Sequence, residues 1–404
     1  MPSLESATVT VWVRTGSRNE KDEKLGLSHF LEHMAFKGGK KYPSAKVVSE
    51  AIDEVGGEFN ASTSKEVTQF YIRIRSRLLE RAFDVLSDIV LYPNLDDKEI
   101  AKEKGVILEE MNMYEDTPMH RIWDLFEQLM FKGHSLGRDI IGTKETVPQL
   151  KRNDFVSYRD NFYHADSMLV GVAGGIDEKR VKNLTEKYFE GVKYSDRKKG
   201  SEKPSEHTEK FHLTSKKVEQ AHIILGFPAA PMGGEGRYKD AVMNTILGSG
   251  MSSRLFTEVR EKRGLAYSVR SDIDRFADAG YFAVYAGTDP KNAQEAIKVI
   301  LNQLYGLADG TFVADKKELE KAKEYLKGHL ALSLEDTRGV NSFFGYEQLM
   351  LGKVRTPDEL YDSVNKVTAD DIYESAKKIF DKEKIKLAII GPFKNAGKFE
   401  KIIT

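Results

Sequence analysis

His29-Phe30-Leu31-Glu32-His33 forms an H-x-x-E-H pattern near the start of the 404-residue chain. We expect these residues to lie on a helix, where side chains four positions apart share one face. His29 and His33 can therefore offer two imidazoles to one metal ion, and Glu32, at the edge of that face, can reach a water molecule on the ion. Two neutral nitrogens, an open position for water and a carboxylate base are the components of metal-assisted hydrolysis. The competing interpretation is a surface helix with two solvated histidines.

The order of the pattern is the reverse of H-E-x-x-H and is termed inverzincin. A third ligand must come from elsewhere, and a second helix is predicted over residues 101–113. In that helix Glu103 and Glu110 lie two turns apart on the side that the apolar residues leave free. The 76 residues between His33 and Glu110 make the full spacing H-x-x-E-H-x76-E. This spacing resembles the M16 family of peptidases, which includes the mitochondrial processing peptidase, pitrilysin and insulin-degrading enzyme.

The resemblance implies a Zn²⁺ ion with three ligands, His29, His33 and Glu110. It also implies that Glu32 is the general base. Glu103 matches a second acidic position of the family and would orient one of the ligands. For the neighbouring Glu109 we keep the simpler interpretation of a solvated carboxylate.

The pattern of the first half recurs in the second half. Residues 221–227 are predicted to form a strand like that of residues 7–13. Between the halves, residues 195–210 are polar and charged, which is typical of a linker. We therefore predict a zinc-binding catalytic domain over residues 1–194 and a second homologous domain over residues 211–404.

Each half is predicted to have an α+β fold, because strand and helix patterns alternate along it. The resemblance implies the same fold, an antiparallel β-sheet packed with α-helices, as in the metallohydrolases like LuxS and the mitochondrial processing peptidase. In the second copy, apolar residues stand about where the metal-binding residues of the first copy stand: Met243, Ile246 and Leu247. This copy is therefore expected to lack a metal site. In the family one more strand usually precedes residues 7–13, so we expect that a strand, and any leader with it, is missing at the start.

Residues 259–267 resemble the signature of the family's second domain. The resemblance implies that Arg260 and Tyr267 contact the carbonyl of the scissile bond, where a cation and a phenol stabilise a developing oxyanion. Without the resemblance, Arg260 would make a surface ion pair and Tyr267 would be a half-buried strand residue. Larger relatives supply these groups from a facing half. We therefore expect a homodimer whose sites are completed in trans.

Asn60 is predicted to lie in the turn before the strand that begins at Val67, and it matches the family's asparagine near the substrate backbone. Ala61 and Thr63 would line an edge strand onto which a peptide adds as a further strand. This mode of binding predicts unfolded peptides as substrates. The simpler interpretation of Asn60 is a left-handed turn residue.

The composition excludes several other classes of protein. A net charge of −1 gives no indication of a nucleic-acid or anionic-membrane partner, and no apolar run approaches the length of a membrane span. The chain has no cysteine, which excludes disulfides, cysteine nucleophiles and thiolate zinc ligands. No secretory signal is visible, and we expect a cytoplasmic protein.

We therefore expect a zinc metalloendopeptidase that hydrolyses short or unfolded polypeptides inside a closed clamshell chamber. One alternative is a non-catalytic subunit like the core proteins of the respiratory cytochrome bc1 complex, which share this fold. Another is a peptidase subunit that works only with a different partner chain. All the predicted ligands and the base are present, which favours the enzyme.

Overall fold

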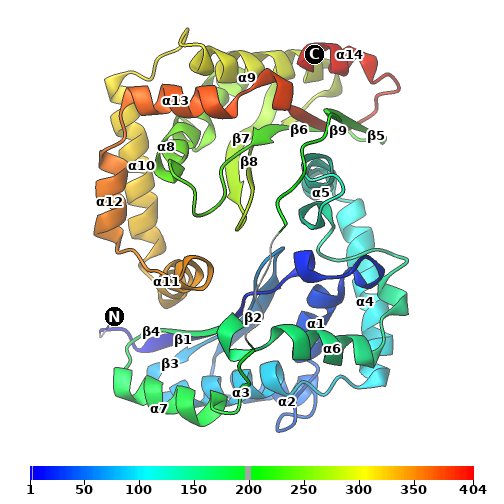
Figure 1. Cartoon of the computed structure of the whole chain (residues 1–404), viewed down its shortest axis with the longest axis vertical. Coiled ribbons are helices and arrows are strands. Elements are labelled where there is room, and N and C mark those ends of the chain that lie inside the picture. Colours follow the sequence, from blue (N-terminus) through cyan, green and yellow to red (C-terminus); the bar gives the residue numbers. More distant parts are fainter. Residues whose placement is uncertain (2, 196–201) are drawn as a thin grey trace. The chain divides into compact units, whose positions relative to one another are not determined.

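The computed structural model describes residues 1, 3–195 and 202–404, and the chain divides into two compact units (Figure 1). The first unit comprises Met1–Met113, Arg138–Lys199 and Leu332–Arg355. The second unit comprises Tyr114–Gly137, Gly200–Ala331 and Thr356–Thr404. Each unit is built on one β-sheet packed with helices, which confirms the predicted α+β fold.

The sheet of the first unit is antiparallel and has the strand order β2-β3-β1-β4. Its strands are β1 (Ser6–Val13), β2 (Glu58–Thr63), β3 (Thr68–Arg75) and β4 (Met168–Gly174). Side chains of β1 alternate between the two faces of the sheet. Val9 and Val11 join the core with α3 (Leu79–Leu91), whereas Thr8 and Trp12 contact α11 (Thr337–Leu351). Helices therefore cover both faces, and β2 forms an edge.

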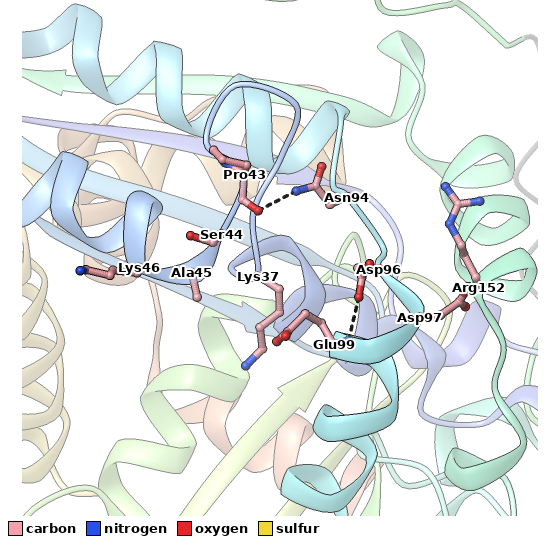
Figure 2. Close-up of a pocket in the computed structure, with 10 residues that line it drawn as sticks. All are labelled: Lys37, Pro43, Ser44, Ala45, Lys46, Asn94, Asp96, Asp97, Glu99 and Arg152. Atoms are coloured by element: carbon pink, nitrogen blue, oxygen red, sulfur yellow. Dashed lines mark hydrogen bonds between the residues drawn. The ribbon is translucent and has the colours of Figure 1, made fainter.

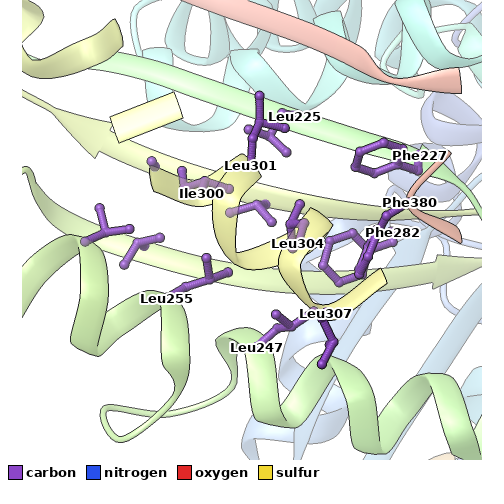
Figure 3. Close-up of a cluster of buried hydrophobic side chains, with 14 of the residues drawn as sticks. Leu225, Phe227, Leu247, Leu255, Phe282, Ile300, Leu301, Leu304, Leu307 and Phe380 are labelled. Atoms are coloured by element: carbon purple, nitrogen blue, oxygen red, sulfur yellow. The ribbon is translucent and has the colours of Figure 1, made fainter. Parts of the chain in front are cut away.

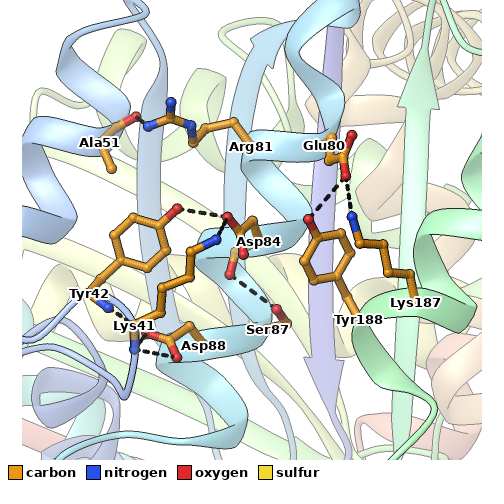
Figure 4. Close-up of polar contacts among 10 residues, drawn as sticks. All are labelled: Lys41, Tyr42, Ala51, Glu80, Arg81, Asp84, Ser87, Asp88, Lys187 and Tyr188. Carbon is orange, nitrogen blue, oxygen red and sulfur yellow. Dashed lines mark hydrogen bonds and ion pairs between the residues drawn. The ribbon is translucent and has the colours of Figure 1, made fainter.

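Helix α3 also anchors the segment that follows the H-x-x-E-H residues (Figure 4). The Asp88 carboxylate accepts hydrogen bonds from the backbone N–H groups of Lys41 and Tyr42 at 2.9–3.0 Å. The Tyr42 hydroxyl donates to Asp84 at 2.9 Å. Figure 4 also shows Glu80 of α3, which accepts hydrogen bonds from α7. The other helices of this unit are α1 (Leu27–Ala35), α2 (Ala45–Asp53), α6 (Arg152–Phe162), α7 (Glu178–Phe189) and most of α4 (Asp97–Glu115).

The sheet of the second unit has the strand order β5-β9-β6-β8-β7. Its strands are β5 (Phe211–Ser215), β6 (Ala221–Pro228), β7 (Ala266–Arg275), β8 (Gly280–Thr288) and β9 (Lys386–Gly391). Without β5, the order β7-β8-β6-β9 repeats the order β2-β3-β1-β4 of the first unit, so the two sheets share one topology. β5 pairs with β9 in parallel, which departs from the wholly antiparallel sheet that we expected. A parallel pair needs a long crossover, and most of the unit separates these strands in the sequence.

The core of the second unit lies between this sheet and α9 (Ala293–Ala308) (Figure 3). Ile300, Leu304 and Leu307 of α9 pack in one buried cluster with Phe227 of β6 and Phe282 of β8. Their spacing of three and four residues places the α9 side chains on one helix face. The unit also contains α8 (Arg237–Gly248), α12 (Pro357–Asn365), α13 (Ala369–Ile379), α14 (Gly397–Ile403) and most of α10 (Lys316–Ser333).

One helix from each half of the sequence belongs to the unit built mainly from the other half. α5 (Pro118–Met130) comes from the first half but packs on β6 and β9, where Ile122 and Phe126 are buried with Tyr281. α11 comes from the second half and packs on β1 and β4. The compact units therefore differ from the predicted division into residues 1–194 and 211–404, because helix-to-sheet packing crosses that boundary.

Two further predictions concern the chain as a whole. Residues 196–201 of the predicted linker, 195–210, lie outside the described residues. In the described part of the chain no helix has both the length and the apolar character of a membrane span. The cytoplasmic location stays a prediction.

Candidate metal centre

Helix α1 carries the H-x-x-E-H residues and begins after a glycine. Gly26 at the N-cap has φ 90°, a left-handed conformation that glycine adopts without strain. The buried Glu20 carboxylate accepts hydrogen bonds from the backbone N–H groups of Gly26 at 2.8 Å and Ser28 at 2.6 Å. Phe30 and Met34 are buried in the core of the unit. The first turn of α1 is thus held by a carboxylate, and the helix turns its imidazoles away from the core.

Three side chains that could hold a metal ion meet beside this face, two from α1 and one from α4. Nε2 of His29 lies 3.9 Å from Oε1 of Glu110, and Nε2 of His33 lies 3.6 Å from Oε2 of the same carboxylate. One donor atom of each residue lies within 4.8 Å of the other two. Two ligands of a tetrahedral zinc ion, each at about 2.0–2.1 Å from it, are roughly 3.4 Å apart. The chemistry of these donors and their spacing therefore fit Zn²⁺.

Glu103 lies behind His33 and fixes which ring nitrogen is free. Nδ1 of His33 is 3.0 Å from Oε1 of Glu103. With Nδ1 donating to this carboxylate, Nε2 carries the free lone pair, and Nε2 is the atom that faces Glu110. The second oxygen of Glu103, Oε2, accepts from Nζ of Lys37 at 2.5 Å. Glu103 is only 5% exposed, so these two partners compensate a buried charge.

The ionisation of the two histidines differs because their surroundings differ. Burial, and to a smaller extent the neighbouring His33, lower the pKa of His29 to about 3. His29 is therefore neutral at physiological pH, which is the form that binds a metal. Burial also lowers the pKa of His33, but the hydrogen bond to Glu103 and the charges of the nearby carboxylates outweigh it and raise the pKa. Because the pKa of His33 is raised, a metal cation that binds this imidazole would have to compete with a proton for the ring nitrogen.

Glu32 extends from α1 toward strand β2. The Thr63 hydroxyl donates a hydrogen bond to Oε2 of Glu32 at 2.5 Å. Burial raises the pKa of the Glu32 carboxyl, and this effect exceeds the lowering by the Thr63 hydrogen bond and by the charge of His33. A carboxylate with a raised pKa is a stronger base than a solvated one, which suits a group that accepts a proton.

Strand β2 carries the residues that we expected to bind the substrate. Asn60 lies within β2 and not in a turn, and its Oδ1 accepts from the N–H group of Ala61 at 2.8 Å. Apart from glycines, Leu95 is the one described residue with positive φ, so the left-handed interpretation of Asn60 is wrong. Asn60 is exposed, whereas Ala61 and Thr63 are half-buried on the other face of the strand. β2 stands at the end of the strand order, which confirms the predicted edge strand; the addition of a peptide to this edge stays a prediction.

Arg260 and Tyr267 lie together in the second unit. Arg260 belongs to a π-helical turn, Phe256–Glu261, and Tyr267 is the second residue of β7. The Arg260 guanidinium lies 4.7 Å from the ring centroid of Phe256 and 5.0 Å from that of Tyr267, a cation–π arrangement. Tyr267 is 73% exposed, so it is not the half-buried strand residue of the simpler interpretation.

The described part of the second unit has no counterpart to the group of donors on α1 and α4. Met243, Ile246 and Leu247 are buried apolar residues of α8. Among the residues that the structure describes, His29, His33 and Glu110 form the one group of three such donors close enough to share an ion.

A polar pocket shares Lys37 with the surroundings of the metal donors (Figure 2). It lies between the start of α2 and the start of α4. The Asn94 side chain donates to the Pro43 carbonyl at 3.0 Å, and Asp96 accepts from the N–H group of Glu99 at 3.2 Å. These polar groups close loops and cap a helix, and the lining of the pocket does not include His29, His33 or Glu110. We therefore place the candidate site at the donors on α1 and α4.

Two residues of the site escaped the sequence analysis. Lys37 follows His33 by four residues, so helical spacing could have placed it on the same face. Glu20 closes a turn of polar residues, where nothing distinguishes a buried carboxylate from a solvated one.

The chain has two α+β units of one topology, and the first unit joins an H-x-x-E-H helix to a glutamate distant in the sequence. These features define a protein of the inverted zinc-peptidase type. Residues 1–144 match the family model for insulinase (peptidase family M16), and residues 149–326 match that for the peptidase M16 inactive domain. "Uncharacterized zinc protease YmxG" of Bacillus subtilis is 41% identical over 98% of this chain and 95% of its own length. "Uncharacterized zinc protease SCO5738" of Streptomyces coelicolor is 37% identical over 98% of this chain and 87% of its own length. The chain therefore belongs to peptidase family M16, as the spacing of its motif predicted.

Solved structures agree with the fold. A protease from Helicobacter pylori superposes with a TM-score of 0.89 at 23% identity, covering 96% of this chain and 94% of its own. A peptidase M16 inactive domain from Pseudomonas fluorescens superposes with a TM-score of 0.90 at 17% identity, covering 97% and 94%. The description of one domain as inactive matches the buried apolar face of α8.

Proposed function

We propose that the chain is a zinc-dependent endopeptidase that cleaves short or unfolded polypeptides. The observation that carries the proposal is the meeting of His29, His33 and Glu110 at ligand spacing on the face of α1 that also carries Glu32. The relatives named zinc proteases support both the metal and the class of reaction.

In this proposal His29 and His33 bind Zn²⁺ through Nε2, and Glu110 binds it through its carboxylate. When bound, Zn²⁺ polarises a carbonyl group and lowers the pKa of a water molecule in its open position. Glu32 accepts the proton of the attacking water and delivers it to the leaving amine. Glu103 keeps the His33 ring in orientation through the hydrogen bond at Nδ1.

The substrate binds as a strand along the outer edge of β2, near Asn60 and Ala61. Arg260 and Tyr267 of a second copy of the chain stabilise the oxyanion, so the enzyme acts as a homodimer. Support for this role comes from the exposure of Tyr267 and from the guanidinium that lies over its ring. Enclosure of the peptide in a chamber stays a prediction.

The substitution Glu32→Gln tests the reaction. It keeps the size of the side chain but removes the base, so we expect peptide hydrolysis to fall roughly 10²- to 10⁴-fold while zinc content stays the same. Glu109→Gln, at an exposed carboxylate of α4, serves as the matched control and should keep full activity. Full activity of Glu32→Gln would contradict the proposal.

The alternatives are separated by two further measurements. Metal analysis of the purified chain should find one zinc ion per chain; a chain that binds no zinc would favour the non-catalytic subunit. Sizing of the protein alone, combined with an activity assay, should find an active homodimer. A chain that gains activity only with a different partner chain would replace the homodimer by a heteromeric peptidase. A peptide library would then identify the cleavage preference.

A further inference from the structure

The strand that ends at Thr63 reaches the side chain of Glu32. The Thr63 hydroxyl donates to Oε2 of Glu32 at 2.5 Å. A hydrogen bond from a hydroxyl to an ionised carboxylate is among the stronger hydrogen bonds in proteins. Thr63 is half-buried on the face of β2 that packs toward α1. The bond therefore links the edge strand to the helix that carries the metal donors.

The backbone around Thr63 is held in place by the turn that follows it. Thr63 pairs with Thr68 of β3. The N–H group of Ser64 donates to the Val67 carbonyl at 2.8 Å, and the Ser64 hydroxyl accepts from the N–H group of Val67 at 3.0 Å. Thr63 is also β-branched, so its χ1 angle is restricted. Its hydroxyl is therefore a donor whose position is set before any substrate binds.

Strand addition does not need this hydroxyl. A peptide that adds to β2 bonds to backbone N–H and C=O groups at its outer edge, whereas the Thr63 side chain points to the face of the sheet. The hydroxyl is already bonded to Glu32. The structure thus gives the Thr63 hydroxyl a partner on α1, whereas the sequence suggested a substrate contact for this residue.

We propose that Thr63 is a positioning residue for the reaction, which holds Oε2 of Glu32 so that Oε1 is the oxygen that takes the proton from water. This inference rests on the proposed peptidase function. A carboxylate held at one oxygen cannot rotate freely, so its other oxygen stays in the orientation that proton transfer requires.

Thr63→Val tests the inference, because valine has the same shape without the hydroxyl. We expect kcat for a peptide substrate to fall roughly 10- to 100-fold, because the lost bond fixes a catalytic group. We expect KM to change less than about twofold, and zinc content and the unfolding midpoint to stay unchanged. Thr63→Ser keeps the hydroxyl and should restore most of kcat. Thr185→Val is the matched control, since it removes a hydroxyl of α7 that donates to the Val181 carbonyl.

Each outcome decides between roles. A raised KM with unchanged kcat would make Thr63 a substrate contact and overturn the inference, as would equal losses in Thr63→Val and Thr63→Ser. Loss of zinc or a lower unfolding midpoint in both Thr63→Val and Thr63→Ala would assign a structural role and also overturn it. An active wild type with an unaffected Thr63→Val overturns the inference alone. A wild-type chain that hydrolyses no peptide overturns the proposed function, and the inference with it.

Discussion

Replacement of Glu103 by alanine should weaken zinc binding by about 10- to 100-fold, or about 1.4–2.7 kcal/mol. Glu103 accepts from Nδ1 of His33 at 3.0 Å and from Nζ of Lys37 at 2.5 Å, and it is 5% exposed. Glu103→Ala leaves the His33 ring free to rotate and to adopt the other tautomer, so that Nε2 faces Glu110 for only part of the time. The measurement is a competition for zinc between the protein and a coloured chelator in metal-free buffer.

Two controls separate this effect from a general loss of structure. Glu109→Ala removes an exposed carboxylate from the same helix and should bind zinc as the wild type does. Glu103→Gln keeps a neutral acceptor for His33, so its affinity should lie between those of Glu103→Ala and the wild type. Equal zinc affinity of Glu103→Ala and the wild type, or an equal loss in Glu109→Ala, would refute the orienting role of Glu103.

Three further predictions follow from contacts within single units. Lys37→Met removes the cation beside Glu103 and should lower zinc affinity by less than about tenfold, and Lys37→Arg should restore it in the same competition assay. Residues 1–194 expressed alone should show no cooperative unfolding transition by circular dichroism. This fragment lacks α11, which covers one face of the first sheet, and it lacks the second sheet, which covers the apolar face of α5. A fragment that unfolds cooperatively as a monomer would refute this prediction. The pKa of Glu20 is raised from 4.5 to about 7, because the effect of burial exceeds the lowering by the hydrogen bonds from Ser28. The native state then binds more protons than the unfolded state between these values, so the free energy of unfolding should fall by about 3 kcal/mol as pH rises from 4.5 to 7. Urea titrations across this range should show the fall in the wild type but not in Glu20→Gln.

The sequence was sufficient to predict which side chains share one face of a helix. His29, Glu32 and His33 lie on one face because the helix repeats every 3.6 residues, and Glu103 and Glu110 lie on one face two turns apart for the same reason. The alternation of polar and apolar residues likewise predicted strands such as β1 and the repetition of one topology. The helix faces and the strand periods depend on the backbone geometry of residues close in the sequence, and the recurrence of these local patterns in the second half indicated the repeated topology.

The meeting of Glu110 with the two imidazoles came from a family spacing and not from local geometry. The tertiary structure alone decided which atoms face each other across elements: the Thr63 hydroxyl on Glu32, Lys37 on Glu103, and the N–H groups of α1 on Glu20. It also decided that α5 and α11 each join the unit built mainly from the other half of the sequence. Helical and strand periods specify which face of an element is apolar, but many partners can cover an apolar face. Which partner does so depends on how the elements pack in three dimensions, and no local pattern contains that information.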